Sequence, residues 1–332
     1  MSPYERLFQP GHAFDHPVTV GVAAALVALL TVAPVVLFLL SRSGISSEQI
    51  SRFWIRWKTW LVMAPLVIAP ILLGAAWTIL GVGLLSLLCY REYARATGLF
   101  REKLISLTIV VSILLVTFAT LDNWYRLFMA LTPISIVLIL TVALFPDRPQ
   151  GYIQRTALAV LGFVLFGHGL GHLGHLANDA DYRPLILLVL VAAETNHFVT
   201  YLMGKSLRQR PLYPNSCSKV TGAGTLCSLI VTTAVVVGLG RSVFAGTVLS
   251  AWHHLLTLGI LISVVGQLGV LIFASIKRDL GIKDFDVTVP GHGGLLDRFD
   301  SLVPIASVVF HYVNYFVGVG ADQSVRIWTT VG

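Results

Sequence analysis

Long apolar stretches separated by short polar loops dominate this sequence and limit what it can fold into. Residues 18–40, 104–121 and 302–319 are examples, and each is about long enough to cross a lipid bilayer as a helix. Hydrophobic residues make up 56% of the chain and charged residues 12%. That charged share is about half of what soluble proteins carry. The runs lack an alternation of apolar and polar residues, so helices are expected rather than a β-barrel.

This pattern predicts an all-α, polytopic transmembrane helical bundle of about ten spans. It forms a single membrane domain over residues 1–332, because no long polar segment could build a second one. Residues 59–90 are too long for one upright helix, and Pro65, Pro70 and Gly74 favour two short helices with a tight turn near Gly74. A single long tilted helix is the alternative. We see no removable signal peptide.

The distribution of Lys and Arg predicts the orientation of the bundle. With the N-terminus outside, the inside loops hold 18 of these residues and the outside segments hold 5. Positive charge concentrates on the cytoplasmic side of membrane proteins, so the loops at residues 204–221 and 275–301 are expected in the cytoplasm. The net charge of +7 then reflects loop bias rather than a nucleic-acid partner. We expect an integral protein of the inner or plasma membrane with its active face in the cytoplasm. A further basic loop, residues 41–58, could form an amphipathic helix at the interface.

Residues 275–301 form the longest run that a membrane would reject. Cations and carboxylates alternate there: Lys277, Arg278, Asp279, Lys283, Asp284, Asp286, Asp297, Arg298 and Asp300, with His292 among Gly291, Gly293 and Gly294. Such a mixture suits a polyphosphate with Mg²⁺, which takes oxygen ligands from one or two carboxylates and from substrate phosphates. The glycines let backbone N–H groups approach an anion closely. The alternative is an ordinary basic loop attracted to anionic lipid headgroups.

The order of residues in this run favours the first interpretation, a site for a polyphosphate with Mg²⁺, over an ordinary basic loop. The sequence has Ser275, Lys277-Arg278 and Lys283-Asp284, followed by Pro290-Gly-His-Gly-Gly-Leu-Leu-Asp297-Arg298-Phe299-Asp300. This order closely resembles the signature of the phosphatidate cytidylyltransferases, or CDP-diacylglycerol synthases. The resemblance implies a polytopic membrane enzyme that uses Mg²⁺. It would transfer a cytidylyl group from CTP to phosphatidate or a related lipid phosphate, giving a CDP-activated lipid and pyrophosphate.

The resemblance also implies roles for individual residues. Those expected at the reaction centre are Asp297, Asp300, Asp284 and His292, with His292 as a hydrogen-bond donor. Those expected to bind substrate are Lys277, Arg278, Lys283, Arg298, Lys219, Gly293 and Gly294. The expected Mg²⁺ ligands are Asp297, Asp300 and Glu194. The expected partners are CTP, the lipid phosphate and the membrane, and a homodimer is left open.

Three departures from the family pattern weigh against activity. Within the loop at residues 204–221 and just beyond it, Ser216 and Lys219 match a second family motif, but Gly222 stands where the family has glutamate. Val270 stands where family members carry a metal-binding aspartate, and Ala274 stands in place of a serine. The alternative function is therefore a degenerate, non-catalytic paralogue that binds lipid or nucleotide in the membrane.

A histidine stripe lies outside this signature. His168, His172 and His175 follow a spacing that puts three imidazoles on one face of a helix. Such a face could bind a transition metal or relay protons, as in an ion-coupled transporter. We favour a polar helix end near the outer surface, where the interleaved glycines permit close helix packing.

Overall fold

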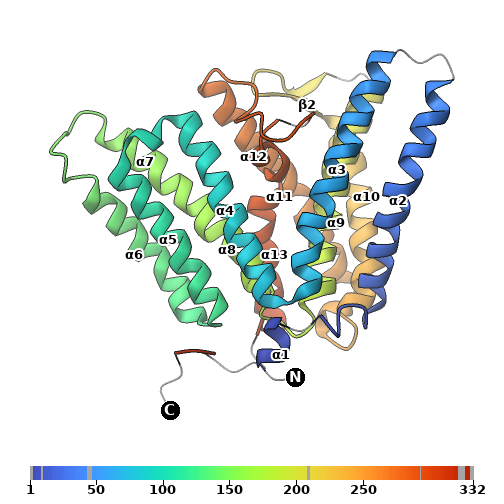
Figure 1. Cartoon of the computed structure of the whole chain (residues 1–332), viewed down its shortest axis with the longest axis horizontal. Coiled ribbons are helices and arrows are strands. Elements are labelled where there is room, and N and C mark those ends of the chain that lie inside the picture. Colours follow the sequence, from blue (N-terminus) through green and yellow to red (C-terminus); the bar gives the residue numbers. More distant parts are fainter. Residues whose placement is uncertain are drawn as a thin grey trace.

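The computed structural model of the chain is a bundle of long helices (Figure 1). It describes residues 3–8, 10–42, 47–207, 210–291, 293–320 and 326–329. Within these residues, eight helices are long and apolar enough to cross a membrane, and the only sheet is a two-stranded one. The predicted fold class, an all-α polytopic membrane bundle, is confirmed.

The elements follow one another in a simple order along the chain. They are α1 (Pro3–Phe8), α2 (Pro17–Ser41), α3 (Ser47–Leu73), α4 (Ala75–Thr97), η1 (Leu99–Arg101), α5 (Lys103–Leu121), α6 (Tyr125–Val142), α7 (Tyr152–Gly162), the π-helical η2 (Phe163–Gly169), α8 (Leu170–Leu176), α9 (Tyr182–Ser206), β1 (Pro211–Tyr213), β2 (Cys217–Thr221), α10 (Gly222–Val243), η3 (Val248–Ser250), α11 (Trp252–Asp279), α12 (Leu295–Phe299) and α13 (Leu302–Phe316). Besides the eight candidate spans, α4 and α13 correspond to the two remaining apolar segments of the sequence.

The chain turns sharply between α3 and α4 at Gly74, as the sequence predicts. Gly74 has φ +148°, and a Cβ built on it would collide with the backbone carbonyl oxygen of Leu7. A glycine is needed here because α1 packs directly against the turn.

The helices on either side of this turn are longer than expected. Two short helices within residues 59–90 were predicted, but α3 has 27 residues and α4 has 23. The basic segment at residues 47–58 is helical and continues into the apolar part of α3, and α4 likewise runs on through Arg91 and Arg95. The prediction was wrong because it took charged residues as helix boundaries. A helix that leaves the membrane can carry charged residues in its last turns.

The apolar core consists of two clusters, and α12 reaches both. One cluster joins α9, α10, α11 and α13 and includes Phe299 of α12. The other joins α4, α5, α6 and η2 and includes Phe285 and Leu296 from residues 275–301. Side chains of residues 275–301 are therefore part of the apolar core of the bundle.

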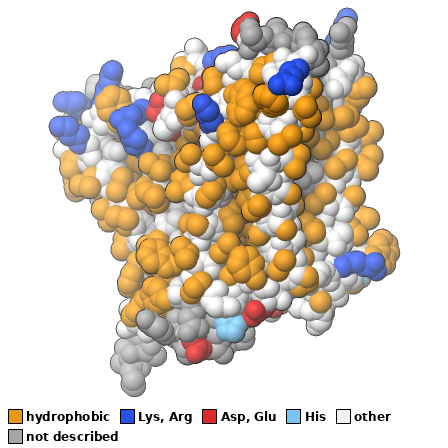
Figure 2. All heavy atoms as spheres, turned by 45° about the vertical axis from the view of Figure 1, so that its right-hand side comes forward, with side chains coloured by type: hydrophobic (Ala, Val, Ile, Leu, Met, Phe, Trp, Pro, Cys, Tyr) orange, Lys and Arg blue, Asp and Glu red, His pale blue; other side chains and the backbone are white. Residues whose placement is uncertain are grey.

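A broad hydrophobic belt covers the face of the bundle seen in Figure 2. On this face, most Lys and Arg side chains gather along one edge of the belt. Helix α2 borders the outside of the bundle, and the most apolar stretch of α2 has no residue buried inside the protein. Its side chains are suited to contact with lipid.

Candidate active site

Residues 275–301, called here the signature loop, comprise the last five residues of α11, a segment that folds back on itself, and α12. Val289 and Gly293 form an antiparallel bridge, in which the two residues exchange backbone hydrogen bonds of 2.7 and 3.1 Å. Gly291 has φ +76° and Gly293 has φ +90°, values that favour glycine. The two glycines thus allow the tight turn that leads into α12. His292 lies outside the described residues, so its predicted role is not addressed by the structure.

Asp297 holds the signature loop together. One of its carboxylate oxygens accepts a hydrogen bond of 2.6 Å from the Lys277 ammonium at the end of α11. The other accepts hydrogen bonds from the backbone N–H groups of Phe285, at 2.9 Å, and Gly294, at 3.0 Å. The Asp297 side chain is only 5% exposed. Its charge is balanced by Lys277 and by the N-terminus of α12.

Glu92, on α4, is a second buried carboxylate at this site, and the sequence analysis gave it no role. It is 3% exposed. It accepts hydrogen bonds from the backbone N–H groups of Leu295 (2.9 Å) and Leu296 (2.8 Å) and from the hydroxyl of Thr288 (2.8 Å). Two carboxylates therefore cap the N-terminus of α12: Asp297 from the helix itself and Glu92 from α4. These carboxylates accept hydrogen bonds from N–H groups that a helix N-terminus leaves without intrahelical partners.

Gly293 and Gly294 lie between the acidic side chains of the site. A Cβ built on Gly293 would lie 3.1 Å from Asp297 Oδ2 and 3.2 Å from Asp284 Oδ1. One built on Gly294 would lie 2.5 Å from Glu92 Oε2 and 3.2 Å from Asp297 Oδ2. Both positions exclude a side chain, because three carboxylates occupy the space beside the backbone there.

The predicted phosphate-binding cations are spread around the loop. Lys277 is bound to Asp297, whereas Arg278 and Lys283 are exposed. Lys219 lies in β2, which pairs with β1 beside the end of α9, and its side chain is outside the described part of the structure. Arg298 points away from this group.

Arg298 turns toward α3 and α9. Its guanidinium forms an ion pair with Glu194 of α9, and its Cζ lies 4.5 Å from the centre of the Trp60 ring of α3. Asp297 and Arg298 are neighbours in sequence, but they contact different parts of the protein.

A cavity of about 740 Å³ opens beside Arg298. Its walls come from α2, α3, α9 and α10, and most of the lining side chains are aliphatic. Arg298 and Phe299 of α12, with Trp60 and Glu194, form part of its lining. Its volume is that of a small-molecule site, and its lining suits a hydrocarbon chain with one charged end.

Comparison with known proteins shows the family to which the chain belongs. A family model described as "Cytidylyltransferase family" matches residues 54–316, which include α12 and all of the signature loop. The chain belongs to the cytidylyltransferase family.

Individual relatives support the same family. The chain is 28% identical to a phosphatidate cytidylyltransferase of Staphylococcus haemolyticus over 73% of its own length and 92% of the relative's. It is 26% identical to one from Bacillus subtilis over 64% and 81% of the two lengths. It is also 30% identical to the uncharacterized protein YnbB of Escherichia coli K12, over 88% and 97%. The family predicted from the signature is therefore confirmed.

Mg²⁺ is the ion that the resemblance to phosphatidate cytidylyltransferases implies. In the described part of the chain, no three His, Cys, Asp or Glu side chains gather in a group that could hold a metal ion. Glu194 is paired with Arg298, and the buried Asp300 accepts a hydrogen bond of 2.7 Å from the N–H of Ser301. Asp284 and Asp297 both approach Gly293, but Asp297 is already paired with Lys277. The metal-binding role of Asp297, Asp300 and Glu194 stays a prediction.

Two of the three departures from the family pattern, Val270 and Ala274, lie on α11, and the third, Gly222, begins α10. Val270 is seven residues before Lys277, so the two share a face of the helix, and Lys277 is the residue that binds Asp297. An aspartate at position 270 would therefore lie on the helix face that carries Lys277. The backbone at Gly269 is also packed tightly, because a Cβ there would be 2.8 Å from the carbonyl oxygen of Asp300.

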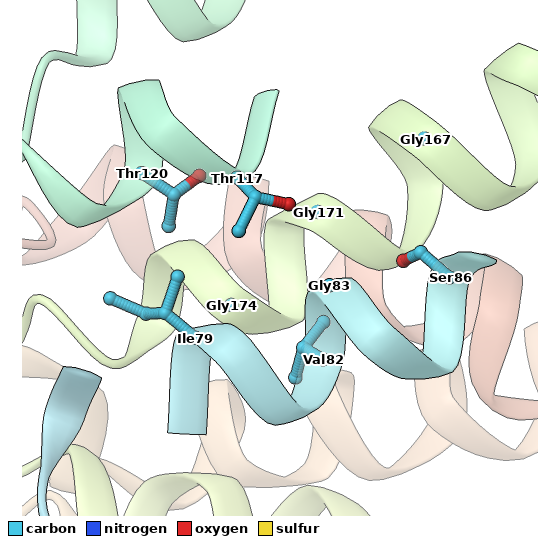
Figure 3. Close-up of a pocket in the computed structure, with 9 residues that line it drawn as sticks. All are labelled: Ile79, Val82, Gly83, Ser86, Thr117, Thr120, Gly167, Gly171 and Gly174. Atoms are coloured by element: carbon cyan, nitrogen blue, oxygen red, sulfur yellow. The ribbon is translucent and has the colours of Figure 1, made fainter. Parts of the chain in front are cut away.

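The histidine stripe packs inside the bundle, away from the signature loop. His168 and His172 have ring centres 4.4 Å apart, and the Phe128 ring lies within 5.0 Å of both. Three glycines of this segment pack closely against neighbouring helices. Figure 3 shows Gly167, Gly171 and Gly174 against α4 and α5, around a space of about 10 Å³, which is at most the size of one water. This packing agrees with the expectation that the glycines serve close helix contact.

Proposed function

We propose that this chain transfers the cytidylyl group of CTP to phosphatidate or a closely related lipid phosphate. The observation that carries the proposal is the position of α12. Asp297 belongs to a polar loop rich in cations, and the adjacent Arg298 borders an apolar cavity. One short helix thus joins a site suited to a polyphosphate with a site suited to a lipid.

The reaction needs no nucleophile from the protein. An oxygen of the lipid phosphate attacks the α-phosphorus of CTP, the bond from that phosphorus to the β-phosphate oxygen breaks, and pyrophosphate leaves. Such a transfer depends on positioning and on neutralising phosphate charge. Lys277, Arg278 and Lys283 would meet the triphosphate, together with Lys219. Arg298 would meet the lipid phosphate. Mg²⁺, when bound, would add positive charge beside the triphosphate.

The carboxylates of Asp297 and Glu92 would act by positioning other groups of the site. Asp297 orients Lys277 and fixes the backbone N–H of Gly294, and Glu92 fixes the start of α12. Glycine at positions 293 and 294 lets these carboxylates approach the backbone closely. We further propose that the site faces the cytoplasm, on the basis of the 18 to 5 distribution of Lys and Arg between the two sides.

A non-catalytic relative that binds lipid or nucleotide is the second candidate. Two observations favour it. Val270 replaces a family aspartate, and the described residues contain no group of three metal-binding side chains. Such a protein would keep the cavity and the cationic loop without turnover.

The deciding experiment is an assay of purified protein in detergent with phosphatidate, Mg²⁺ and labelled CTP. We expect labelled CDP-lipid, and we expect Asp297→Ala to lower its formation by at least about a hundredfold, because Lys277 and the loop lose their anchor. Asp279→Ala is the matched control, since Asp279 is an exposed carboxylate in the same segment.

Three outcomes separate the candidates. Turnover that is lost in Asp297→Ala and kept in Asp279→Ala supports the enzyme. Binding of CTP without turnover supports the non-catalytic relative. A large gain of activity in Val270→Asp would show that the native site is weakened at α11.

A further inference from the structure

We propose that Gly21 and Gly238 set the length of the acyl chain that the cavity beside Arg298 accepts. The two glycines would keep open the part of the cavity farthest from Arg298, and larger side chains in their place would shorten it. This inference rests on the proposed lipid-phosphate substrate and adds to it a selection by chain length.

The cavity is elongated and has charged groups at only one end. Along α2 its lining runs from Pro17 to Leu29, which is about 18 Å at the rise of an α-helix. The indole N–H of Trp57 donates a hydrogen bond of 2.9 Å to the carbonyl oxygen of Leu30, so this part of α3 lies beside the Leu29 end. Trp60, one turn further along α3, carries the Arg298 guanidinium over its ring. A lipid phosphate at Arg298 would thus direct its hydrocarbon chain toward Pro17.

The opposite end of the cavity lies where α2 meets α10. His16 Nδ1 accepts a hydrogen bond of 3.2 Å from the backbone N–H of Val18, and His16 Nε2 donates one of 3.2 Å to the carbonyl oxygen of Ser242. Pro17 and Ser242 line the cavity beside this contact. A chain that starts at Arg298 and follows α2 therefore meets protein backbone at this end.

Gly21 and Gly238 line the cavity from two different helices, α2 and α10. Gly21 is five residues from His16, and Gly238 is four residues from Ser242. The helical rise therefore places both glycines about 6–8 Å from the end where α2 and α10 meet. A Cβ built on either glycine has no neighbour within 4 Å, so a larger side chain would extend into the cavity.

Packing does not account for these two glycines. Gly259 shows the contrast, because a Cβ there would lie 2.7 Å from Thr233 Cα, and glycine lets α10 and α11 approach each other. No such contact exists at Gly21 or Gly238, and glycine weakens a helix that carries it. What glycine provides at these two positions is the space beside it.

Fit, and not hydrophobic burial, would select the chain. An acyl chain is already among apolar groups in the bilayer, so moving it into an apolar cavity gains little from the hydrophobic effect. A chain too long for the cavity must bend or push the helices apart, whereas a chain too short leaves part of the space unfilled. Leucine at position 21 or 238 would block the last stretch of about 6 Å. An extended chain advances about 1.2 Å per bond, so the limit should fall by about five carbons.

Native mass spectrometry of the purified protein in detergent tests this without CTP. The protein is incubated with an equimolar mixture of saturated diacyl phosphatidates, from dihexanoyl to distearoyl, and the chain length with the highest occupancy is measured. In Gly21→Leu and in Gly238→Leu we expect this optimum to move to chains about five carbons shorter than in the wild type. Occupancy by the wild-type optimum should fall by about fivefold or more.

Ala24→Leu is the matched control. Ala24 is an exposed residue of α2 that is not part of the cavity lining, so this variant adds a leucine to the same helix outside the cavity. It should keep the wild-type optimum. Because the two glycines belong to different helices, either glycine variant tests the proposal if the other fails to fold.

Several results would overturn the proposal. They are an unchanged optimum in the glycine variants, an equal shift in Ala24→Leu, and a wild type that binds no phosphatidate or binds all chain lengths equally. Phosphatidate bound only to the outer hydrophobic belt would leave the optimum unchanged. A protein that forms CDP-lipid but keeps its optimum in the glycine variants would disprove the length limit alone. A shifted optimum without formation of CDP-lipid would disprove the proposed reaction alone.

Discussion

At the scale of single residues, Gly294 is the point where acidic side chains from distant parts of the chain come closest. A Cβ there would lie 2.5 Å from Glu92 Oε2 and 3.2 Å from Asp297 Oδ2. Its φ of −81° is open to any residue, so the need for glycine comes from space and not from backbone strain. The positions of both carboxylates depend on the absence of this one side chain.

We expect Gly294→Ala to destabilise the site. The added methyl group must push Glu92 away from the N–H groups of Leu295 and Leu296, which lowers the free energy of unfolding by about 1–3 kcal/mol. Formation of CDP-lipid should fall with it. Thermal unfolding in detergent measures the first effect and the labelled-CTP assay the second. Gly11→Ala is the control, since a Cβ at Gly11 has nothing within 4 Å. A Gly294→Ala protein as stable as the wild type would contradict the steric argument.

Glu92 shows which part of the site the sequence does not reveal. The cluster of Lys277, Asp284 and Asp297 was expected because all three lie in one motif. Glu92 is 203 residues from Leu295, to which it binds, and lies between Arg91 and Arg95 in what looked like an ordinary basic loop. No local spacing connects it to α12. Only the packing of α4 against the signature loop does.

At the scale of elements, the C-terminal segment at residues 326–329 docks on the turn between α5 and α6. Asp122 Oδ1 accepts hydrogen bonds from the backbone N–H groups of Ile327, at 2.9 Å, and Trp328, at 2.6 Å. Its Oδ2 accepts one from the hydroxyl of Thr329. Burial by itself raises the pKa of Asp122, but these hydrogen bonds outweigh it and hold the pKa below its usual value.

The docking of this segment should therefore depend on pH. Because the pKa of Asp122 is lower in the docked state than the usual value of about 3.9, its stabilising effect is complete above that value. The effect is lost as the pH falls through the lowered pKa. The emission difference between the wild type and Trp328→Phe, followed from pH 7 to about pH 2, reports the release. We expect a step in the acid range in the wild type and none in Asp122→Asn. A step of equal size in Asp122→Asn would assign the change to another group.

The helices themselves were largely predictable, and the cavity between them was not. Apolar length predicted the succession of spans, and Gly74 the turn, because both are local properties. The extension of α3 back to Ser47 was obscured by the basic residues in its first turns. The cavity arises from four helices that are far apart in the sequence, α2, α3, α9 and α10, and no periodicity within one helix encodes their spacing.

At the scale of the whole molecule, the bundle is polarised along the membrane normal. The signature loop and the β1–β2 hairpin lie at one end in Figure 1, and α1 lies at the other. On the face shown in Figure 2, most Lys and Arg lie along one edge of the hydrophobic belt. The proposed orientation would put the end of the bundle that is rich in Lys and Arg in the cytoplasm.

Labelling in intact cells tests that orientation. In a chain whose three cysteines are replaced by serine or alanine, Lys283→Cys should react with a membrane-impermeant maleimide only after the cells are permeabilised. Arg126→Cys, in the first turn of α6, should react from outside. Both native side chains are exposed, so access to each is governed by the membrane. If both positions were labelled from the same side, the expected number of spans between them would be wrong.

The five residues of α12 give this architecture a further property. Leu296 belongs to one apolar cluster and Phe299 to the other, while Asp297 and Arg298 serve the polar loop and the cavity. Consecutive Cα atoms are about 3.8 Å apart, and one helical turn leaves no slack between them. A movement of the α12 backbone at Arg298 would therefore also move Asp297. On the proposed function, binding of the lipid beside Arg298 and binding of the nucleotide beside Asp297 would be coupled through the peptide unit that joins these two residues.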